Sequence, residues 1–216
     1  MAAKSVYSCI RQLGRPVFTT DEARAISGRS PSAATQALNY LARQGIIFKI
    51  YRGVWAEAGT GRVSPYSVMP FLFSRQRVYL SFISALHLYG IIEQIPQVIT
   101  LASVSHTKTL RTKAGTFSVH QLVPSFFTGF DWYKGTGTFL IAEPEKALVD
   151  SLYLSACKKR QFGHFPEMRF PRSFSFKKAE EWTKAIPNVM VRASVQRKLA
   201  HLKAGSRHPA SSSILS

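Results

Sequence analysis

The side chains best suited to chemistry lie in one stretch, RSPSAATQALNYLARQGIIFKIYR, between Arg29 and Arg52. The amides of Gln36 and Asn39 carry the donor and acceptor pair that binds adenine bidentately, and Arg43 can pair with guanine or phosphate. Small hydroxyls near a helix start suit phosphates, and a basic hairpin suits the backbone or the minor groove. The candidate set for nucleic-acid contact is Arg29, Ser30, Ser32, Thr35, Gln36, Asn39, Arg43, Lys49, Tyr51 and Arg52.

Two short helices joined by a tight turn are predicted to position these residues. Thr19 followed three residues later by Glu22 predicts a capping box, and Gly28 can take the left-handed conformation that ends a helix. Ser30 then predicts a new N-cap, with Pro31 at the first helical position, where its missing N–H costs nothing. The sequence therefore predicts a helix-turn-helix.

The elements around this pair complete a recognisable pattern. Ala34, Leu38 and Leu41 form one apolar stripe of the second helix, which turns its polar residues outward. A further helix is expected over 5–13, and the runs IIFKIY and VWAEA on either side of Arg-Gly predict a hairpin. Three helices and a hairpin with a basic tip are typical of a winged helix-turn-helix, whose second paired helix enters the major groove.

A plainer interpretation of this polar face stays open. Polar residues on one helix face are commonly only solvated, and a winged module can also contact proteins. DNA binding is favoured because the cap, the turn, the basic bias and the hairpin all agree.

The overall charge supports an anionic partner. The 216 residues hold 29 Lys and Arg against 11 Asp and Glu, a net charge of +18, so nucleic acid is the leading partner class and an anionic membrane the second. No apolar run is long enough to span a bilayer and no secretory signal is recognisable, so a cytoplasmic protein is expected. Cys9 and Cys157 lie far apart without metal-type spacing, so neither a disulfide framework, a metal site nor a cofactor is expected.

An α+β protein with two domains is predicted. The expected organisation is a winged helix-turn-helix at 1–58, a linker at 59–70, a larger α+β domain with a small mainly antiparallel sheet at 71–204, and a disordered tail at 205–216. The elements expected in the larger domain are a buried helix over 78–89, strands over 97–103 and 116–122 with a polar loop between them, a hairpin around 134–137, and a helix beginning at Pro144. His87 is expected to be packed and hydrogen-bonded.

Most of the positive charge lies outside the N-terminal module. Residues 1–58 have a net charge of +5, which leaves +13 for the rest. In the last predicted helix, four cations are expected to face outward: Arg192, Arg197, Lys198 and Lys203. Such a surface can hold DNA, RNA or an acidic protein, or can simply be solvated.

An enzyme is not predicted. The only acidic cluster is AEPEKALVD, and helix capping together with a Lys146–Asp150 helix pair accounts for it. No Walker loop, HExxH or G-x-S-x-G motif is present.

Three segments, SPSAATQALNYLARQGIIFKIYRGVW, YLSFISALHLYGI and FLIAEPEKALVDSLYL, give the chain a resemblance to the AbiEi family of antitoxins and transcriptional regulators. It covers residues 5–157 and is most specific in SALHLYG and AEPEKALVD. The resemblance implies a type IV toxin-antitoxin system of phage defence, in which the N-terminal domain represses its own operon at inverted repeats. It also implies a C-terminal domain that counters a nucleotidyltransferase-like toxin.

The positions implied for DNA contact are Ser32, Thr35, Gln36, Asn39 and Arg43, with Lys49 and Arg52 on the wing. A monomer or weak dimer in solution is expected, with two copies on an inverted repeat. The alternative hypothesis is an orphan regulator, or an RNA-binding or nuclease-accessory protein, without antitoxin activity.

Overall fold

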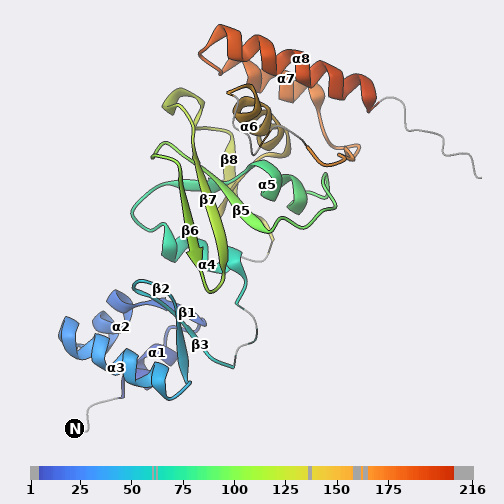
Figure 1. The fold of residues 1–216 in the computed structure, drawn as a ribbon. Coiled ribbons are helices and arrows are strands. Elements are labelled where there is room, and N and C mark those ends of the chain that lie inside the picture. The colour runs from blue at the N-terminus through green and yellow to red at the C-terminus, as the bar shows by residue number, and fades with distance from the viewer. Residues whose placement is uncertain are drawn as a thin grey trace, which may run out of the picture. The chain divides into compact units, whose positions relative to one another are not determined.

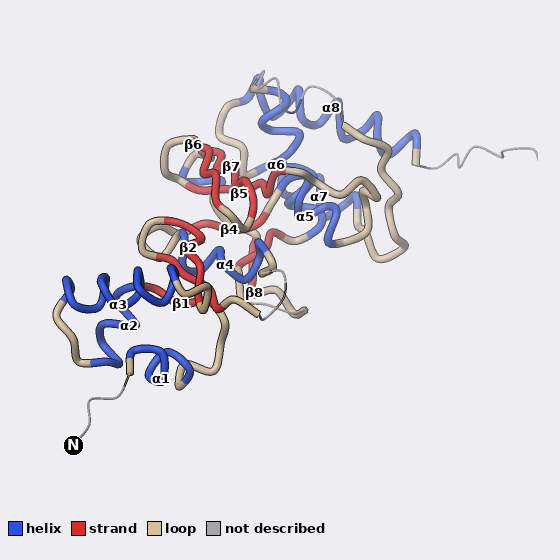
Figure 2. The backbone as a smooth tube through the Cα atoms, turned by 60° about the horizontal axis from the view of Figure 1, so that its bottom comes forward, coloured by secondary structure: helices blue, strands red, loops and turns tan. Residues whose placement is uncertain are grey.

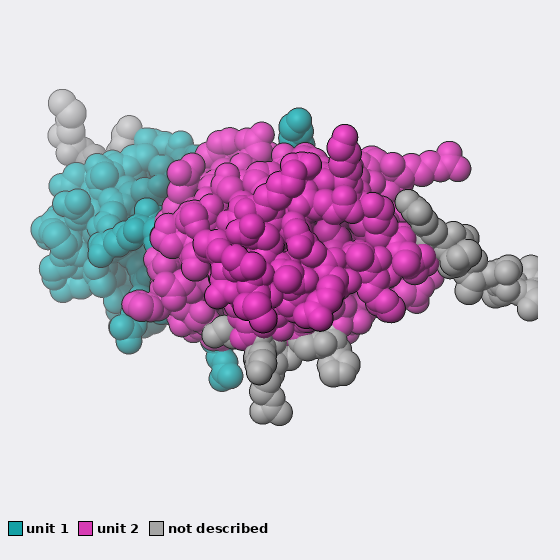
Figure 3. All heavy atoms as spheres, turned by 90° about the horizontal axis from the view of Figure 1, so that it is seen from above, with its two compact units in different colours: residues 1–76, 110–116, 134–139 teal, residues 77–109, 117–133, 140–216 magenta. Residues whose placement is uncertain are grey.

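The computed structural model forms two compact units (Figure 1; Figure 3). It describes residues 5–59, 61, 63–135, 138–157, 162 and 165–206. Unit 1 comprises residues 1–76, 110–116 and 134–139, and unit 2 comprises residues 77–109, 117–133 and 140–216. From residue 207 onward, the tail expected at 205–216 lies outside the described residues.

Three helices and a three-stranded antiparallel sheet form the N-terminal module. The helices are α1 (Val6–Arg11), α2 (Thr20–Ser27) and α3 (Pro31–Arg43), and the strands are β1 (Val17–Thr19), β2 (Ile47–Tyr51) and β3 (Val54–Glu57) in the order β1-β3-β2. The three helices and the hairpin were predicted. Strand β1 was not, because three residues show no periodicity and this strand exists only through its pairing with β3.

The predicted helix caps are present. The Thr19 hydroxyl accepts a hydrogen bond from the Glu22 amide at 3.1 Å, and the Glu22 carboxylate accepts one from the Thr19 amide at 2.8 Å. Gly28 ends α2 with φ of 63°, and the Ser30 hydroxyl caps α3. The turn between α2 and α3 is therefore fixed by local hydrogen bonds and one left-handed residue.

A single apolar cluster holds this module together. Ile10 of α1, Phe18 of β1, Leu38 of α3 and Ile47 of β2 are buried in it. Trp55 of β3 joins them, and its indole nitrogen donates a hydrogen bond to the Thr20 hydroxyl at 2.9 Å.

Part of the expected linker is helical. Helix α4 (Pro65–Leu72) begins after Ser64, whose hydroxyl accepts a hydrogen bond from the Tyr66 amide at 3.3 Å. The Gly, Ser and Pro content of this stretch predicted a linker, but its Ser-Pro pair begins a helix in the same way as the Ser-Pro pair that begins α3.

The second sheet has six strands and is mixed. It contains β4 (Val78–Leu80), β5 (Val98–Ser103), β6 (Lys108–Thr112), β7 (Gly115–Gln121), β8 (Phe130–Trp132) and β9 (Leu140–Ala142) in the order β6-β7-β5-β4-β9-β8. Strand β4 is antiparallel to β5 and parallel to β9, and β8 is antiparallel to β9. The α+β class is confirmed, and the sheet includes one parallel pair, β4 with β9, that the expectation of a mainly antiparallel sheet did not specify.

Two of the predicted elements differ from the structure. The helix expected over 78–89 begins as strand β4, and only Phe82–Leu88 is helical, as α5. The polar loop expected between the first two strands contains β6, whose exposed side chains resemble those of a loop because it is an edge strand. His87 is hydrogen-bonded through Nδ1 to the Ile92 carbonyl at 3.0 Å, as predicted.

The helices of unit 2 form layers beside the sheet. Helix α5 contacts β5, and α6 (Pro144–Ala156) contacts α5 and β9. Helices α7 (Phe176–Lys184) and α8 (Val189–Gly205) pack on α6 and on each other, and Figure 2 shows these helices grouped together.

A buried ionic network is formed by side chains on the inner face of α6 and by residues around them. Lys146 and Asp150, predicted as a helix pair, form a salt bridge whose side chains are both fully buried. Asp150 also accepts hydrogen bonds from the hydroxyls of Tyr79 at 3.0 Å and Ser81 at 2.7 Å, and the Lys146 ammonium lies 3.7 Å from the centroid of the Phe126 ring. Burial lowers the pKa of Lys146 and raises that of Asp150, while their mutual attraction opposes both shifts.

Candidate nucleic-acid interface

One face of α3 carries the polar residues that the sequence predicted. Because helical residues recur 3.6 to a turn, positions separated by four, three and four residues fall within an arc of about 60°. The buried residues Ala34, Leu38 and Leu41 occupy the opposite side. The exposed side chains in this arc are Ser32, Gln36, Asn39 and Arg43.

Strand β2 extends this face into an open hollow of about 550 Å³. The ammonium of Lys49 lies 5.3 Å from the centroid of the Trp55 ring, which fixes it beside the helix by a cation–π contact. The hollow is lined by Gln36, Asn39, Ala42, Arg43, Lys49 and Trp55. The structure therefore brings together four of the predicted contact residues from two elements.

Other predicted residues lie around this hollow rather than in it. Arg29 and Ser30 are exposed in the turn before α3, and Arg52 is exposed at the tip of the β2–β3 hairpin. Thr35 is exposed, but its hydroxyl donates to the Pro31 carbonyl at 2.9 Å, within its own helix. Tyr51 is half-buried, which leaves less of its ring for an external contact.

Ion pairing separates the cations of this module into two groups. Arg11 lies 3.6 Å from Glu57, and Arg15 lies 2.5 Å from Glu22. Both pairs lie away from the α3 face. The four cations at and around the hollow make no ion pair with any residue that the structure describes: Arg29, Arg43, Lys49 and Arg52.

Two acidic residues of the module, Glu22 and Glu57, are paired with arginines. Burial alone would raise the pKa of Glu22, but hydrogen bonds from the Thr19 amide and from Arg15 lower it below the ordinary value. Glu22 therefore stays ionised and engaged at the start of α2. This arrangement leaves the positive field of the α3 face largely uncompensated.

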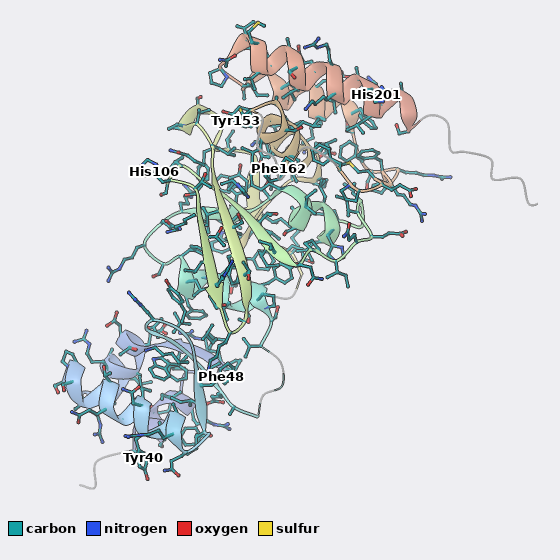
Figure 4. All side chains as sticks on the ribbon, viewed as in Figure 1. Tyr40, Phe48, His106, Tyr153, Phe162 and His201 are labelled. Atoms are coloured by element: carbon teal, nitrogen blue, oxygen red, sulfur yellow. The ribbon has the colours of Figure 1, made fainter. Side chains whose placement is uncertain are left out.

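Two side chains at or near this face, Trp55 and Tyr40, were not predicted from the sequence. Trp55 looks like an ordinary core residue and is buried, yet it also lines the hollow. A β-bulge in β2 pairs Lys49 with Trp55, and nothing in the sequence marks that register shift. Tyr40 is 57% exposed on α3 (Figure 4), and it was passed over because an aromatic residue of an amphipathic helix commonly packs inward.

Within the described ranges, neither a cluster of metal ligands nor a membrane-spanning helix is present. No group of three His, Cys, Asp or Glu side chains is placed there to hold a metal ion. Among the helices described, none is both long and apolar enough to cross a bilayer. Cys9 and Cys157 are both free.

Comparison with known proteins gives a family match for this module. Residues 9–58 match the family described as "Transcriptional regulator, AbiEi antitoxin". The match begins within α1 and ends just after β3, so it includes α3 and the hairpin. A search of curated proteins found no match to the chain.

Proposed function

We propose that this protein, whose residues 9–58 match the AbiEi family of transcriptional regulators, binds double-stranded DNA through the face formed by α3 and the β2–β3 hairpin. The observation that carries the proposal is the hollow that joins Gln36 and Asn39 to Arg43 and Lys49. Two amides beside unpaired cations supply base recognition and phosphate attraction in one place.

The module acts as a winged helix-turn-helix. Helix α3 enters the major groove, where Gln36 and Asn39 contact base edges and Arg43 contacts guanine or phosphate. Lys49 and Arg52 on the hairpin then face the DNA backbone or the minor groove. At the start of α3 the Ser30 hydroxyl accepts from the Ala33 amide and Pro31 has no N–H, so the Ser32 amide is the first-turn donor that can face a phosphate.

The wider role follows from the family. We propose that the protein represses its own operon at inverted repeats. Two copies occupy each site, because an inverted repeat has two equivalent half-sites and each binds one module. We further propose that unit 2 supplies antitoxicity against a nucleotidyltransferase-like toxin encoded beside it. These roles need binding and not catalysis.

Fluorescence anisotropy on the duplex upstream of the gene tests the DNA interface. Arg43→Ala should weaken binding, and if Arg43 contacts phosphate, the slope of log K against log salt should fall by about 0.9. The double variant Gln36→Ala/Asn39→Ala should lose preference for the upstream duplex over a shuffled duplex while keeping the wild-type salt slope. Arg11→Ala is the matched control, because it removes the same charge from α1, away from the α3 face.

Three outcomes would contradict the interface. One is an unchanged affinity and salt slope in the Arg43 variant, and another is an equal loss in the Arg11 control. The third is a preference of the wild-type protein for RNA or single strands over the duplex, which would support the RNA-binding alternative.

Co-expression with the product of the neighbouring gene tests antitoxicity separately. Full-length protein should restore growth, and Arg43→Ala should also restore growth while derepressing a reporter fused to the promoter. Growth that neither form restores would leave the protein a regulator only.

A further inference from the structure

Unit 2 contains a second hollow, between α6, α8 and the segment that precedes α7. Its volume is about 530 Å³. Pockets that bind small molecules commonly have volumes of about 300–1,000 Å³. The hollow is lined by Leu152, Ser155, Phe165, Ser194, Arg197, Lys198, His201 and Leu202.

One part of this hollow is apolar. Leu152 is buried in α6, and Leu202 is half-buried in α8. The half-buried ring of Phe165 lies with them and also lines an adjoining hollow together with His201 and Leu202. An aromatic ring at the edge of an apolar surface suits a flat, apolar or aromatic group of a ligand.

The other part is cationic. Arg197 and His201 are exposed one helical turn apart, so they share a face of α8 (Figure 4 labels His201). Lys198 is held at the wall, where its ammonium donates a hydrogen bond to the Ser155 hydroxyl at 2.6 Å. No carboxylate is among the described lining residues of this hollow, and Glu167 lines the adjoining hollow together with His201.

We propose that this hollow binds a nucleoside phosphate. The planar guanidinium of Arg197 matches the geometry of a phosphate, and His201 and Lys198 supply further donors. The Phe165 ring then stacks against the base, and the leucines cover the sugar. A compact ligand with one anionic and one flat end fits this hollow better than an extended acidic peptide, because the basic lining residues Arg197, Lys198 and His201 all come from the single helix α8.

Calorimetric titration of the full chain with AMP tests the cationic wall. Arg197→Ala and His201→Ala should each weaken AMP binding about tenfold, the effect expected for losing one hydrogen bond to a charged phosphate. Lys203→Ala is the control: it removes a charge from the same helix, but its ammonium is paired with Glu180 at 2.7 Å and it does not line the hollow. The control should keep the wild-type affinity within about twofold, on the usual scale for a substitution at an exposed ion pair.

Phe165→Leu tests the aromatic end. This variant should bind AMP several-fold more weakly, because stacking on a base contributes about 1–3 kcal/mol. It should bind ribose 5-phosphate as the wild type does, since that ligand has no base. A thermal melt of each variant checks that the fold of unit 2 is intact.

The proposal is overturned if millimolar AMP gives no binding, or if Arg197→Ala and Lys203→Ala have equal effects. It is also overturned if a ribooligonucleotide binds more tightly than AMP and depends on the same residues, because the hollow would then belong to a strand-binding surface. Arg43→Ala should leave AMP binding unchanged, so failure here is separable from failure of the DNA interface.

Discussion

The two units differ in how many of their cations are ion-paired. In unit 1, Arg11 and Arg15 are paired with acids, whereas Arg29, Arg43, Lys49 and Arg52 at and around the first hollow make no ion pair among the described residues. Unit 2 pairs several cations internally, as with Lys178 and Glu143 at 2.9 Å and Lys184 and Glu181 at 2.7 Å. Unit 1 has 13 Lys and Arg against 3 Asp and Glu, a net charge of +10, and unit 2 has 16 against 8, a net charge of +8. Unit 2 therefore has more acidic residues with which to pair its cations.

This comparison corrects an expectation about α8. Three of the four cations predicted to be free on that helix are engaged: the Arg192 guanidinium donates to the Ile186 carbonyl at 2.9 Å, Lys198 donates to Ser155, and Lys203 pairs with Glu180. Arg197 is exposed and faces the second hollow. Only Lys203 is paired with an acid, so its charge is compensated locally, whereas the neutral acceptors of Arg192 and Lys198 leave the charges of these two residues in place.

The largest expected effect concerns the buried pair of unit 2. Asp150→Asn should lower the free energy of unfolding by about 3–5 kcal/mol, because it leaves the buried Lys146 ammonium without its counter-charge. Glu181→Gln, which breaks an exposed pair with Lys184, should cost no more than about 1 kcal/mol. Denaturant titration measures both, and equal effects would show that burial does not distinguish the two pairs.

The next effect separates the two faces of α3. Leu38→Ala should lower the free energy of unfolding by about 2–5 kcal/mol, because Leu38 is fully buried in the core cluster of unit 1. Tyr40→Ala, two residues further along the helix and exposed, should stay within about 0.5 kcal/mol of the wild type. Chemical denaturation followed by circular dichroism gives both values. A large loss for Tyr40→Ala would mean that this ring packs in a way the structure does not show.

A smaller effect compares an unpaired cation with an ion-paired cation in the salt dependence of DNA binding. Arg52→Ala, at the exposed hairpin tip, should lower the salt slope of DNA binding by about 0.9 if Arg52 contacts phosphate. Lys203→Ala should leave that slope unchanged, because Lys203 is paired with Glu180. Anisotropy titrations at several salt concentrations measure the two slopes. An equal decrease of the slope in Lys203→Ala and Arg52→Ala would contradict this difference between the two units.

The N-terminal module was largely predictable because its signals are local. The Thr19 capping box, the left-handed Gly28 and the Ser30 cap each act within a few residues, and the apolar stripe of α3 repeats at helical spacing. The elements that sequence reasoning missed are short or lie at an edge, such as β1, β4 and β6. Strands β1 and β4 depend on pairing with strands that are distant in the chain, which no local pattern records. Strand β6 lies beside its sequence neighbour β7, and its exposed side chains made it resemble a loop.

Part of the candidate site could also be predicted. Gln36, Asn39 and Arg43 share a face because of helical spacing alone, whereas Lys49 reaches them through a β-bulge and its contact with Trp55. The second hollow could not be predicted from the sequence, because its walls, α6 and α8, are about forty residues apart in the chain. Lys203 likewise meets Glu180 only because α7 packs on α8.

The smallest expected effect concerns the start of α2, and it depends on pH. The pKa of Glu22 is lowered in the folded protein, so its contribution to stability is fully present above its unfolded pKa and is lost as the pH falls through the folded value. Glu22→Gln should therefore be less stable than the wild type near neutral pH, by at most about 1 kcal/mol because the carboxylate is partly exposed. The difference should shrink as the pH is lowered through the folded pKa of Glu22, because the carboxylate then becomes protonated. A difference that stayed constant from pH 7 to pH 3 would mean that the charge of Glu22 does not contribute to the cap, and that hydrogen-bond geometry alone positions α2 against the turn that leads into α3.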